Sequence, residues 1–283
     1  VRKVTYDLDA VMPGFFDRFA HALDPEEGAA PEDDPGILTL ARYAPSRYRL
    51  DDDFDAYEVQ LAGLIRSGLL KRFESSPHAF AVTCERMADN HDAFLALLDH
   101  GKVATGTALA DWVATDSDDL DEVDTYLDGH VDVTDDAQEY DIDALAAHAA
   151  HDRDLLRSFA EEARLVTREH DPNLAALVEE LITIATDAAT EGIGEQEVRD
   201  KRKVLIFSYF ADTVDWIVEH LSEVIAHDDR LAGYRDRIAA LCSGRLCPAV
   251  ATASASPQQV GGWMAGQFEA PAAVAGAVAQ GSL

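Results

Sequence analysis

The sequence predicts a mostly α-helical protein whose later part begins an α/β unit. Apolar residues recur at helical spacing through much of the range 37–195, and stretches rich in Pro, Gly and acidic residues separate the predicted helices. The apolar run 204–208 is typical of a strand buried on both faces of a parallel sheet, and an amphipathic segment follows it. Because a strand followed by a helix opens an α/β unit, we expect one to begin within 201–243.

The composition is strongly acidic. The 283 residues include 54 Asp plus Glu and 23 Lys plus Arg, for a net charge of −31, and five of the basic residues are Lys. Acid-rich, Lys-poor surfaces suit a cytosol with molar salt, where a Debye length of about 3 Å screens like-charge repulsion. We therefore expect a salt-adapted (halophilic), cytoplasmic protein, with a simply acidic protein as the alternative. The sequence has neither an apolar run of membrane-spanning length nor a signal peptide, so we expect no membrane association.

The first 36 residues are predicted to form a short strand, a turn, a helix and a linker. Pro13 and Gly14 mark the turn, and the helix follows them as far as Leu23. The linker, 24–36, is rich in Pro, Gly and acidic residues.

Two successive helices are expected next. The range 54–73 carries one apolar helical face, made of Tyr57, Leu61, Leu64, Ile65 and Leu69. Ser75 or Ser76 can cap a second helix, with Pro77 in its first turn and Gly101 after its end. An apolar seam with steps of four and three residues suits the packing of two helices side by side. The seam is Phe80, Cys84, Met87, His91, Phe94 and Leu98.

The acid-crowded range 114–143 is predicted to be a solvated surface loop, and a helix over 141–166 follows it. His148 and His151 share a face of that helix, but no further metal ligands accompany them, which favours exposed structural histidines.

A further helix and a loop lead to the apolar run. The helix covers 171–190, with Asp171 as its cap and Pro172 at its first position. Residues 191–202 are predicted to be a loop.

The apolar run 204–208 is then expected to place Val204, Leu205, Ile206 and Phe207 in a core. The helix after it carries a stripe formed by Val214, Ile217, Val218 and Leu221, and 237–244 is a candidate for the next strand.

The range 244–283 has a different character from the rest. It contains one acidic residue, Glu269, whereas the other 53 precede it. A salt-adapted protein is not expected to lose its acidic residues so abruptly. We expect either a non-native, out-of-frame end or a disordered low-complexity tail rich in Ala and Gly.

Common catalytic motifs are absent from the sequence. GxxxxGK[ST], HExxH, GxSxG and GxGxxG do not occur, so no phosphate loop is available. The sequence 121–124 spells a DExD box, but no apolar strand precedes it. The odd number of cysteines, three without a CxxC pair, favours reduced structural thiols.

Two segments resemble a known family. KVLIFSYFADTVDWIVEHL (203–221) resembles motif IV, which opens the second RecA-like lobe of superfamily-two helicases, above all the Swi/Snf-like branch. LARYAPSRYRL (40–50) and especially GLLKRFESSPHAF (68–80) look like the helical segment that bacterial and archaeal Swi/Snf-like helicases insert between the lobes. The likeness covers about residues 1–244.

This resemblance implies a division of the chain and a role in DNA translocation. The implied parts are the end of the first lobe with a linker (1–36), a helical insertion (37–195), the start of the second lobe (201–243) and the tail (244–283). The intact enzyme would use ATP and Mg²⁺ and act on DNA, with its first lobe in the same or a neighbouring chain. This chain lacks the phosphate loop, the DExH box and the arginine finger, and Arg245 does not match the finger pattern. We therefore expect it to be inactive alone.

The resemblance also implies candidate site residues. Ser208, Tyr209 and Phe210 would contact the nucleic-acid backbone or pack the turn there, with a helix cap as the alternative role of Ser208. Lys71 and Arg72 would be secondary phosphate contacts, with ion pairs to acidic residues as their alternative role.

Two other function classes stay open. These alternatives are a non-enzymatic helical interaction module and an acidic DNA mimic. The charge argues against tight DNA binding at low salt, but its spread along the whole helical region is what salt adaptation predicts.

Overall fold

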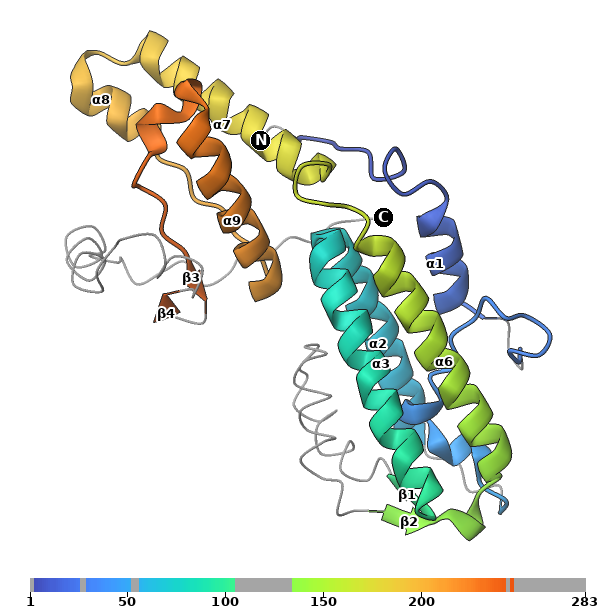
Figure 1. The fold of residues 1–283 in the computed structure, drawn as a ribbon. Helices are drawn as coiled ribbons and strands as arrows, with labels where there is room; N and C mark the ends of the chain where they lie inside the picture. The colour runs from blue at the N-terminus through green and yellow to red at the C-terminus, as the bar shows by residue number, and fades with distance from the viewer. Residues whose placement is uncertain (1–2, 26–28, 52–55, 105–133, 243–244, 247–283) are drawn as a thin grey trace.

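The computed structural model describes residues 3–25, 29–51, 56–104, 134–242 and 245–246. Within these ranges the protein is mostly helical, as predicted. Long helices α2 (Ala56–Ser75), α3 (Pro77–Asp99) and α6 (Ile142–Ala163) lie side by side, and α1 (Phe15–Leu23) lies beside α6 (Figure 1). Helices α7 (Pro172–Glu191), α8 (Gly194–Lys201) and α9 (Ala211–His227) lie beyond the end where α2 turns into α3 (Figure 1).

Short elements complete the described fold. Two antiparallel ladders are present, β1 (Lys102–Ala104) with β2 (Thr134–Asp136), and β3 (Leu241–Cys242) with β4 (Arg245–Leu246). The first closes the far end of the bundle, with Lys102 opposite Asp136 (Figure 1). The 3₁₀ helices are η1 (Ala41–Tyr43), η2 (Pro45–Tyr48), η3 (Ala137–Glu139) and η4 (Asp229–Tyr234).

The reversal between α2 and α3 follows the predicted capping chemistry. Ser76 is the N-cap of α3, and its hydroxyl oxygen accepts a hydrogen bond from the Ala79 amide at 3.0 Å. Pro77 occupies the first helical position, where its missing N–H leaves no helical hydrogen bond unmade. Both helices can therefore meet at one capping residue, which places the end of α2 beside the start of α3.

Five phenylalanines form the centre of the bundle. Phe15 and Phe19 come from α1, and Phe73, Phe80 and Phe159 come from α2, α3 and α6. The rings of Phe19 and Phe80 meet edge to face at 4.8 Å, and those of Phe15 and Phe73 stack at 5.4 Å. Aromatic pairs at these separations add to the stabilisation from burial alone. This phenylalanine cluster joins all four helices.

The apolar seam of α3 is confirmed. Every seam residue predicted from the sequence is buried: Phe80, Cys84, Met87, His91, Phe94 and Leu98. Burial also raises the pKa of the Cys84 thiol, as expected for a structural cysteine. The seam continues to a second cluster near β1, where Phe94 and Leu98 pack with Val103.

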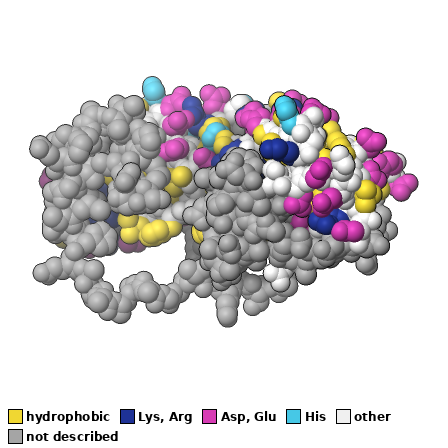
Figure 2. All heavy atoms as spheres, turned by 90° about the horizontal axis from the view of Figure 1, so that it is seen from below, with side chains coloured by type: hydrophobic (Ala, Val, Ile, Leu, Met, Phe, Trp, Pro, Cys, Tyr) yellow, Lys and Arg dark blue, Asp and Glu magenta, His cyan; other side chains and the backbone are white. Residues whose placement is uncertain are grey.

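Arginines of α6 face carboxylates of α3 along the outside of the bundle. Arg153 pairs with Asp92 at 3.1 Å, Arg157 with Asp89 and Asp92, and Arg164 with Glu85. These groups are partly exposed, so each pair contributes little on its own. Seen from below, carboxylates and basic groups are scattered together over the described surface (Figure 2). The pairs cross-link two helices that also pack together in the apolar core.

A buried carboxylate on α6 anchors the segment before α2. Asp152 accepts hydrogen bonds from the Thr39 amide (2.7 Å), the Thr39 hydroxyl (2.8 Å) and the Ala41 amide (3.0 Å). Between these two residues Leu40 adopts a left-handed conformation (φ 57°), which is unfavourable for a residue with a side chain. The two amide contacts on either side hold Leu40 there. Burial raises the pKa of Asp152, although these hydrogen bonds oppose the effect.

The two histidines of α6 have structural contacts. His151 Nε2 lies 3.0 Å from the Ile37 carbonyl oxygen, and His148 Nδ1 lies 2.8 Å from the Tyr48 hydroxyl. Both fix the segment 37–48 against α6, so their role is structural as predicted, but they are half-buried where the sequence predicted exposed histidines.

A separate apolar core forms between α7, α9 and η4. Its buried residues are Leu181, Ile182, Leu221, Ile225 and Leu231. The predicted cap of α7 is confirmed, because Asp171 accepts hydrogen bonds from the amides of Asn173 and Leu174.

The loop predicted over 191–202 is wrong, because α8 forms there. Gly194 begins this helix with φ 81°. Acidic residues occupy its first turn and basic residues its last turn, the arrangement that the helix dipole favours. Glu197 also accepts a hydrogen bond from the Ile193 amide at 2.9 Å. The charge pattern of 194–201 was a signal for this helix that the prediction of a loop did not use.

The strand predictions fail within the described residues. Neither 3–7 nor 204–208 is a strand, and within 237–242 only β3 pairs. Leu205, Ile206 and Phe207, predicted to be core, are 76%, 44% and 88% exposed. An apolar run becomes a strand only where neighbouring strands take up its backbone groups, and no described strand does so for 204–208. The RecA-like lobe therefore stays a prediction.

Two other predictions fall outside the described residues. They concern residues 114–133 of the predicted acidic loop, 114–143, and nearly all of the tail, of which only Arg245 and Leu246 are described. The rest of the predicted loop, 134–143, is wrong as a loop, because it contains β2, η3 and the start of α6. None of the described helices combines the length and the apolarity that crossing a bilayer requires.

The phenylalanine cluster yields a matched pair of variants. Phe15 is fully buried, whereas its neighbour Phe16 is 51% exposed. We expect Phe15→Ala to lower the free energy of unfolding by about 3–5 kcal/mol, because it leaves a cavity among the other rings. We expect Phe16→Ala to lower it by at most about 1 kcal/mol. Chemical denaturation in molar KCl measures both, and equal losses would contradict the assigned cluster.

The buried His91 predicts a loss of stability in acid. Burial lowers its pKa to about 3, with help from Arg42, and its Nδ1 lies 2.7 Å from the Met87 carbonyl oxygen. Below pH about 6.5 the unfolded chain binds a proton at this residue while the native chain does not. The free energy of unfolding therefore falls by about 1.4 kcal/mol per pH unit between pH 6.5 and pH 3.

The test compares wild type with His91→Gln by denaturation at pH 7 and pH 5. His91 should account for about 2 kcal/mol of the wild-type loss, and the variant should lack that part. His100→Gln is the control, since His100 makes the same contact with a carbonyl oxygen four residues earlier but is exposed. Parallel pH profiles for wild type and His91→Gln would refute the assignment.

Candidate nucleic-acid interface

The three predicted contact residues lie where an extended segment enters α9. Ser208 is partly buried, and its Oγ accepts a hydrogen bond from the Phe210 amide at 3.3 Å. Tyr209 is 69% exposed and meets the edge of the Phe210 ring at 5.0 Å. Phe210 is buried and is the N-cap residue of α9. Ser208 therefore stabilises the turn that precedes the helix, and Tyr209 is the member most accessible to a ligand.

The extended segment 204–209 is exposed over most of its length. Leu205, Phe207 and Tyr209 are largely exposed, and Ile206 is 44% exposed. Val204 and Ser208 are partly buried, and Val204 packs against the core between α7 and α9.

Arg72 of α2 contacts the residues at the start of α9. Its guanidinium carbon is 4.1 Å from the centroid of the Phe210 ring, and its Nη1 donates to Asp212 Oδ2 at 3.0 Å. Arg72 and Phe210, two predicted site residues 138 positions apart in the sequence, are thus in contact. Arg72 forms the ion pair left as its alternative role, and its side chain is only 3% exposed. Lys71, the next residue on α2, is exposed instead.

Hydroxyl groups extend this contact between α2, α3 and α9. Thr213 Oγ1 lies 2.7 Å from Ser75 Oγ and 3.0 Å from Ser76 Oγ. Asn173 Nδ2 donates to the Ser75 carbonyl oxygen at 3.5 Å. The sequence analysis assigned Ser75 and Ser76 only a local capping role, because their partners are far away along the chain.

Trp216 is a functional candidate that the sequence analysis missed. Its Nε1 donates to Asp171 Oδ2 at 2.9 Å, and the His78 ring stacks on its indole at 4.3 Å. Arg168 lies over the same ring at 5.4 Å and pairs with Glu219. Burial lowers the pKa of His78, so the stacked ring is neutral near pH 7. In the sequence, the only feature that pointed to Trp216 was its position on the predicted amphipathic helix.

The start of α9 is suited to an anion. Its N-cap residue Phe210 makes no side-chain cap hydrogen bond, so no capping side chain takes up the first amides there. Backbone amides and the helix dipole at such an end favour a phosphate. Asp212 in the first turn opposes this attraction, but its carboxylate is paired with Arg72.

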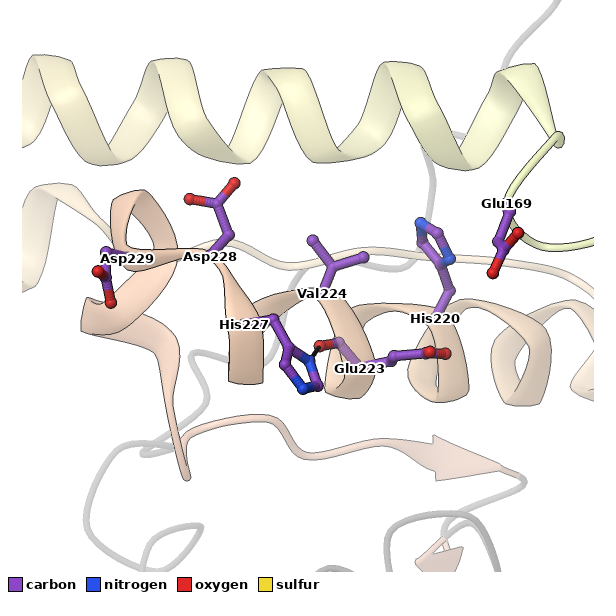
Figure 3. Close-up of a pocket in the computed structure, with 7 residues that line it drawn as sticks. All are labelled: Glu169, His220, Glu223, Val224, His227, Asp228 and Asp229. Atoms are coloured by element: carbon purple, nitrogen blue, oxygen red, sulfur yellow. Dashed lines mark hydrogen bonds between the residues drawn. The ribbon is translucent and has the colours of Figure 1, made fainter.

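A shallow hollow of about 490 Å³ lies on another side of α9. Its lining residues are Glu169, His220, Glu223, Val224, His227, Asp228 and Asp229. Figure 3 shows Val224 and Asp228 directed toward α7, whereas His227 points away and contacts the Glu223 carbonyl oxygen at 2.8 Å. Four carboxylates make this hollow unsuitable for a phosphate group.

Among the described residues, no group of three or more His, Cys, Asp or Glu is arranged to hold a metal ion. The sequence has no phosphate loop.

Comparison with known proteins does not assign the chain to a family. No protein-family model, curated protein or solved structure matches the chain.

Proposed function

We propose that the chain is part of an ATP-dependent, Swi/Snf-like DNA helicase or translocase. Its role is to hold the two lobes together as a helical scaffold and to contact the nucleic-acid backbone. The observation that carries the proposal is the contact between the two segments that resemble the family, 68–80 and 203–221. They meet through Arg72 with Phe210 and Asp212, and through Ser76 with Thr213.

The local chemistry supports a phosphate contact at 208–210. Tyr209 is exposed, the start of α9 is uncapped, and Arg72 neutralises the carboxylate nearest to that end. A phosphate there would accept hydrogen bonds from the amides of α9, and the Tyr209 ring would lie beside the sugar or a base.

The rest of the proposed enzyme lies outside the residues described above. ATP and Mg²⁺ would bind to a first lobe, in the same or a neighbouring chain. The exposed face of Leu205 and Phe207 supports a strand that joins the sheet of a second lobe. The enzyme would act in the cytosol, where molar salt screens the charge of −31 against DNA.

A helical interaction module is the second candidate. The observation that favours it is the same exposed apolar face, formed by Leu205, Phe207 and Tyr209, which a partner protein would cover. A DNA mimic has less support, because many of the described carboxylates pair with arginines instead of facing solvent alone, as in the pairs of Asp92 with Arg153 and Arg157.

An ATPase assay tests whether the chain acts alone. We expect no DNA-stimulated ATP hydrolysis by the purified chain in molar KCl, because its sequence has no loop to hold the phosphates. The measurement is phosphate release with and without duplex DNA. Turnover that persists after repurification would show that the chain contains an active site.

Photo-cross-linking tests the proposed DNA contact. In molar KCl, where the repulsion is screened, bromodeoxyuridine-substituted duplex DNA should cross-link to the tryptic peptide 204–230, which contains Tyr209. We expect Tyr209→Ala to reduce this adduct at least about fivefold, because a stacked ring is lost. Tyr6→Ala is the matched control and should leave it unchanged, since Tyr6 is a partly exposed tyrosine on another segment.

The absence of an adduct on 204–230 would contradict the DNA contact. An adduct that Tyr209→Ala leaves unchanged would contradict the assigned residue. Either result favours the interaction module.

A further inference from the structure

The described residues contain apolar cores on either side of a polar junction. One group of buried residues joins α1, α2, α3 and α6, and another joins α7, α9 and η4. The contacts from α2 and α3 to α9 are an ion pair, hydroxyl groups and stacked rings. Junctions of this polar kind permit relative motion more readily than apolar ones. The position of α9 on the bundle therefore depends on a few specific contacts.

Arg72 is the most constrained of these contacts. Its side chain is 3% exposed, so its charge is nearly removed from water, whereas Asp212 keeps 32% exposure. A buried guanidinium is stable only while its partners stay in place, because an uncompensated charge in such a site is strongly unfavourable. The Phe210 ring covers the guanidinium from one side and Asp212 holds it from another. Any shift of the start of α9 breaks both contacts together.

We propose that Arg72 is a positioning residue that locks the α7–α9 unit onto the helical bundle. It couples the two cores into one cooperative structure and sets the direction in which the segment 208–210 leaves the bundle. When Arg72 loses its contacts, the α7–α9 unit moves about the connection 164–171 between α6 and α7. The proposal rests on packing and charge alone, and it does not depend on the proposed function.

The neighbouring contacts guide this motion without replacing the lock. The Thr213 hydroxyl contacts and the stacking of His78 on Trp216 involve neutral groups, which water can solvate when they separate. Separating the buried Arg72 guanidinium from Asp212 leaves its charge less compensated, which is more unfavourable than separating neutral groups.

The test uses Trp216 as a probe at the junction. Replacing the other two tryptophans, by Trp112→Phe and Trp263→Phe, leaves Trp216 as the sole fluorophore. Its fluorescence reports the junction, whereas far-UV circular dichroism reports all helices. Denaturation in molar KCl is followed by both signals. In this background we expect coincident transitions, as for one cooperative unit.

Arg72→Met keeps an unbranched apolar side chain but removes the charge. We expect the fluorescence transition of this variant to move to lower denaturant than the main circular dichroism transition, because the α7–α9 unit unfolds separately. We also expect X-ray scattering to show a larger radius of gyration. Arg72→Lys keeps the charge without the planar stacking surface and should give an intermediate separation.

Two further variants make the test decisive. Lys71→Met removes the adjacent, exposed charge and should keep the transitions coincident. Asp212→Asn breaks the ion pair from its more exposed side and should separate them, even where Arg72→Met fails to fold. Coincident transitions in a folded Asp212→Asn or Arg72→Met protein would overturn the proposal. Equal separation by Lys71→Met would also overturn it.

Discussion

The turn between α2 and α3 is the constraint on which the rest of the described structure depends. Ser76 caps α3 and lets the chain reverse at one residue. On the inner side, Phe73 and Phe80 enter the phenylalanine cluster that joins α1, α2, α3 and α6. On the outer side, Arg72 and Ser76 hold the start of α9. One short stretch thus supplies both the centre of the bundle and its connection to the second core.

The acidic composition makes the few basic residues structurally important. Arg153 and Arg157 of α6, and Arg164 at its C-cap, pair with carboxylates of α3, and Arg72 joins α2 to α9. The outer pairs are partly exposed and weaken in salt, so each contributes little on its own. Arg72 differs because it is buried, where salt screens its ion pair much less. Its contribution should therefore persist in the molar salt that the composition predicts.

Features set by nearby residues could be predicted from the sequence, and features set by distant ones could not. The caps Ser76 and Asp171 and the α3 seam depend on neighbours within a few turns, and the structure confirms them. The prediction of a buried strand at 204–208 was wrong, because an apolar run becomes a strand only where neighbouring strands pair with its backbone. The meeting of Arg72 with Phe210 is also a long-range event, so the sequence indicated both residues without indicating their contact.

The segment 204–209 before α9 is extended, and contacts at both of its ends hold it in place. At one end the Lys203 amide donates to the Asp200 carbonyl oxygen at the end of α8, and at the other Phe210 is fixed beneath Arg72. Between these ends the segment is extended, with Leu205 and Phe207 exposed. Little backbone entropy would then be lost on binding, because the extended conformation already exists. The Arg72 contact that joins the two cores therefore also presents this segment to a ligand or a neighbouring strand.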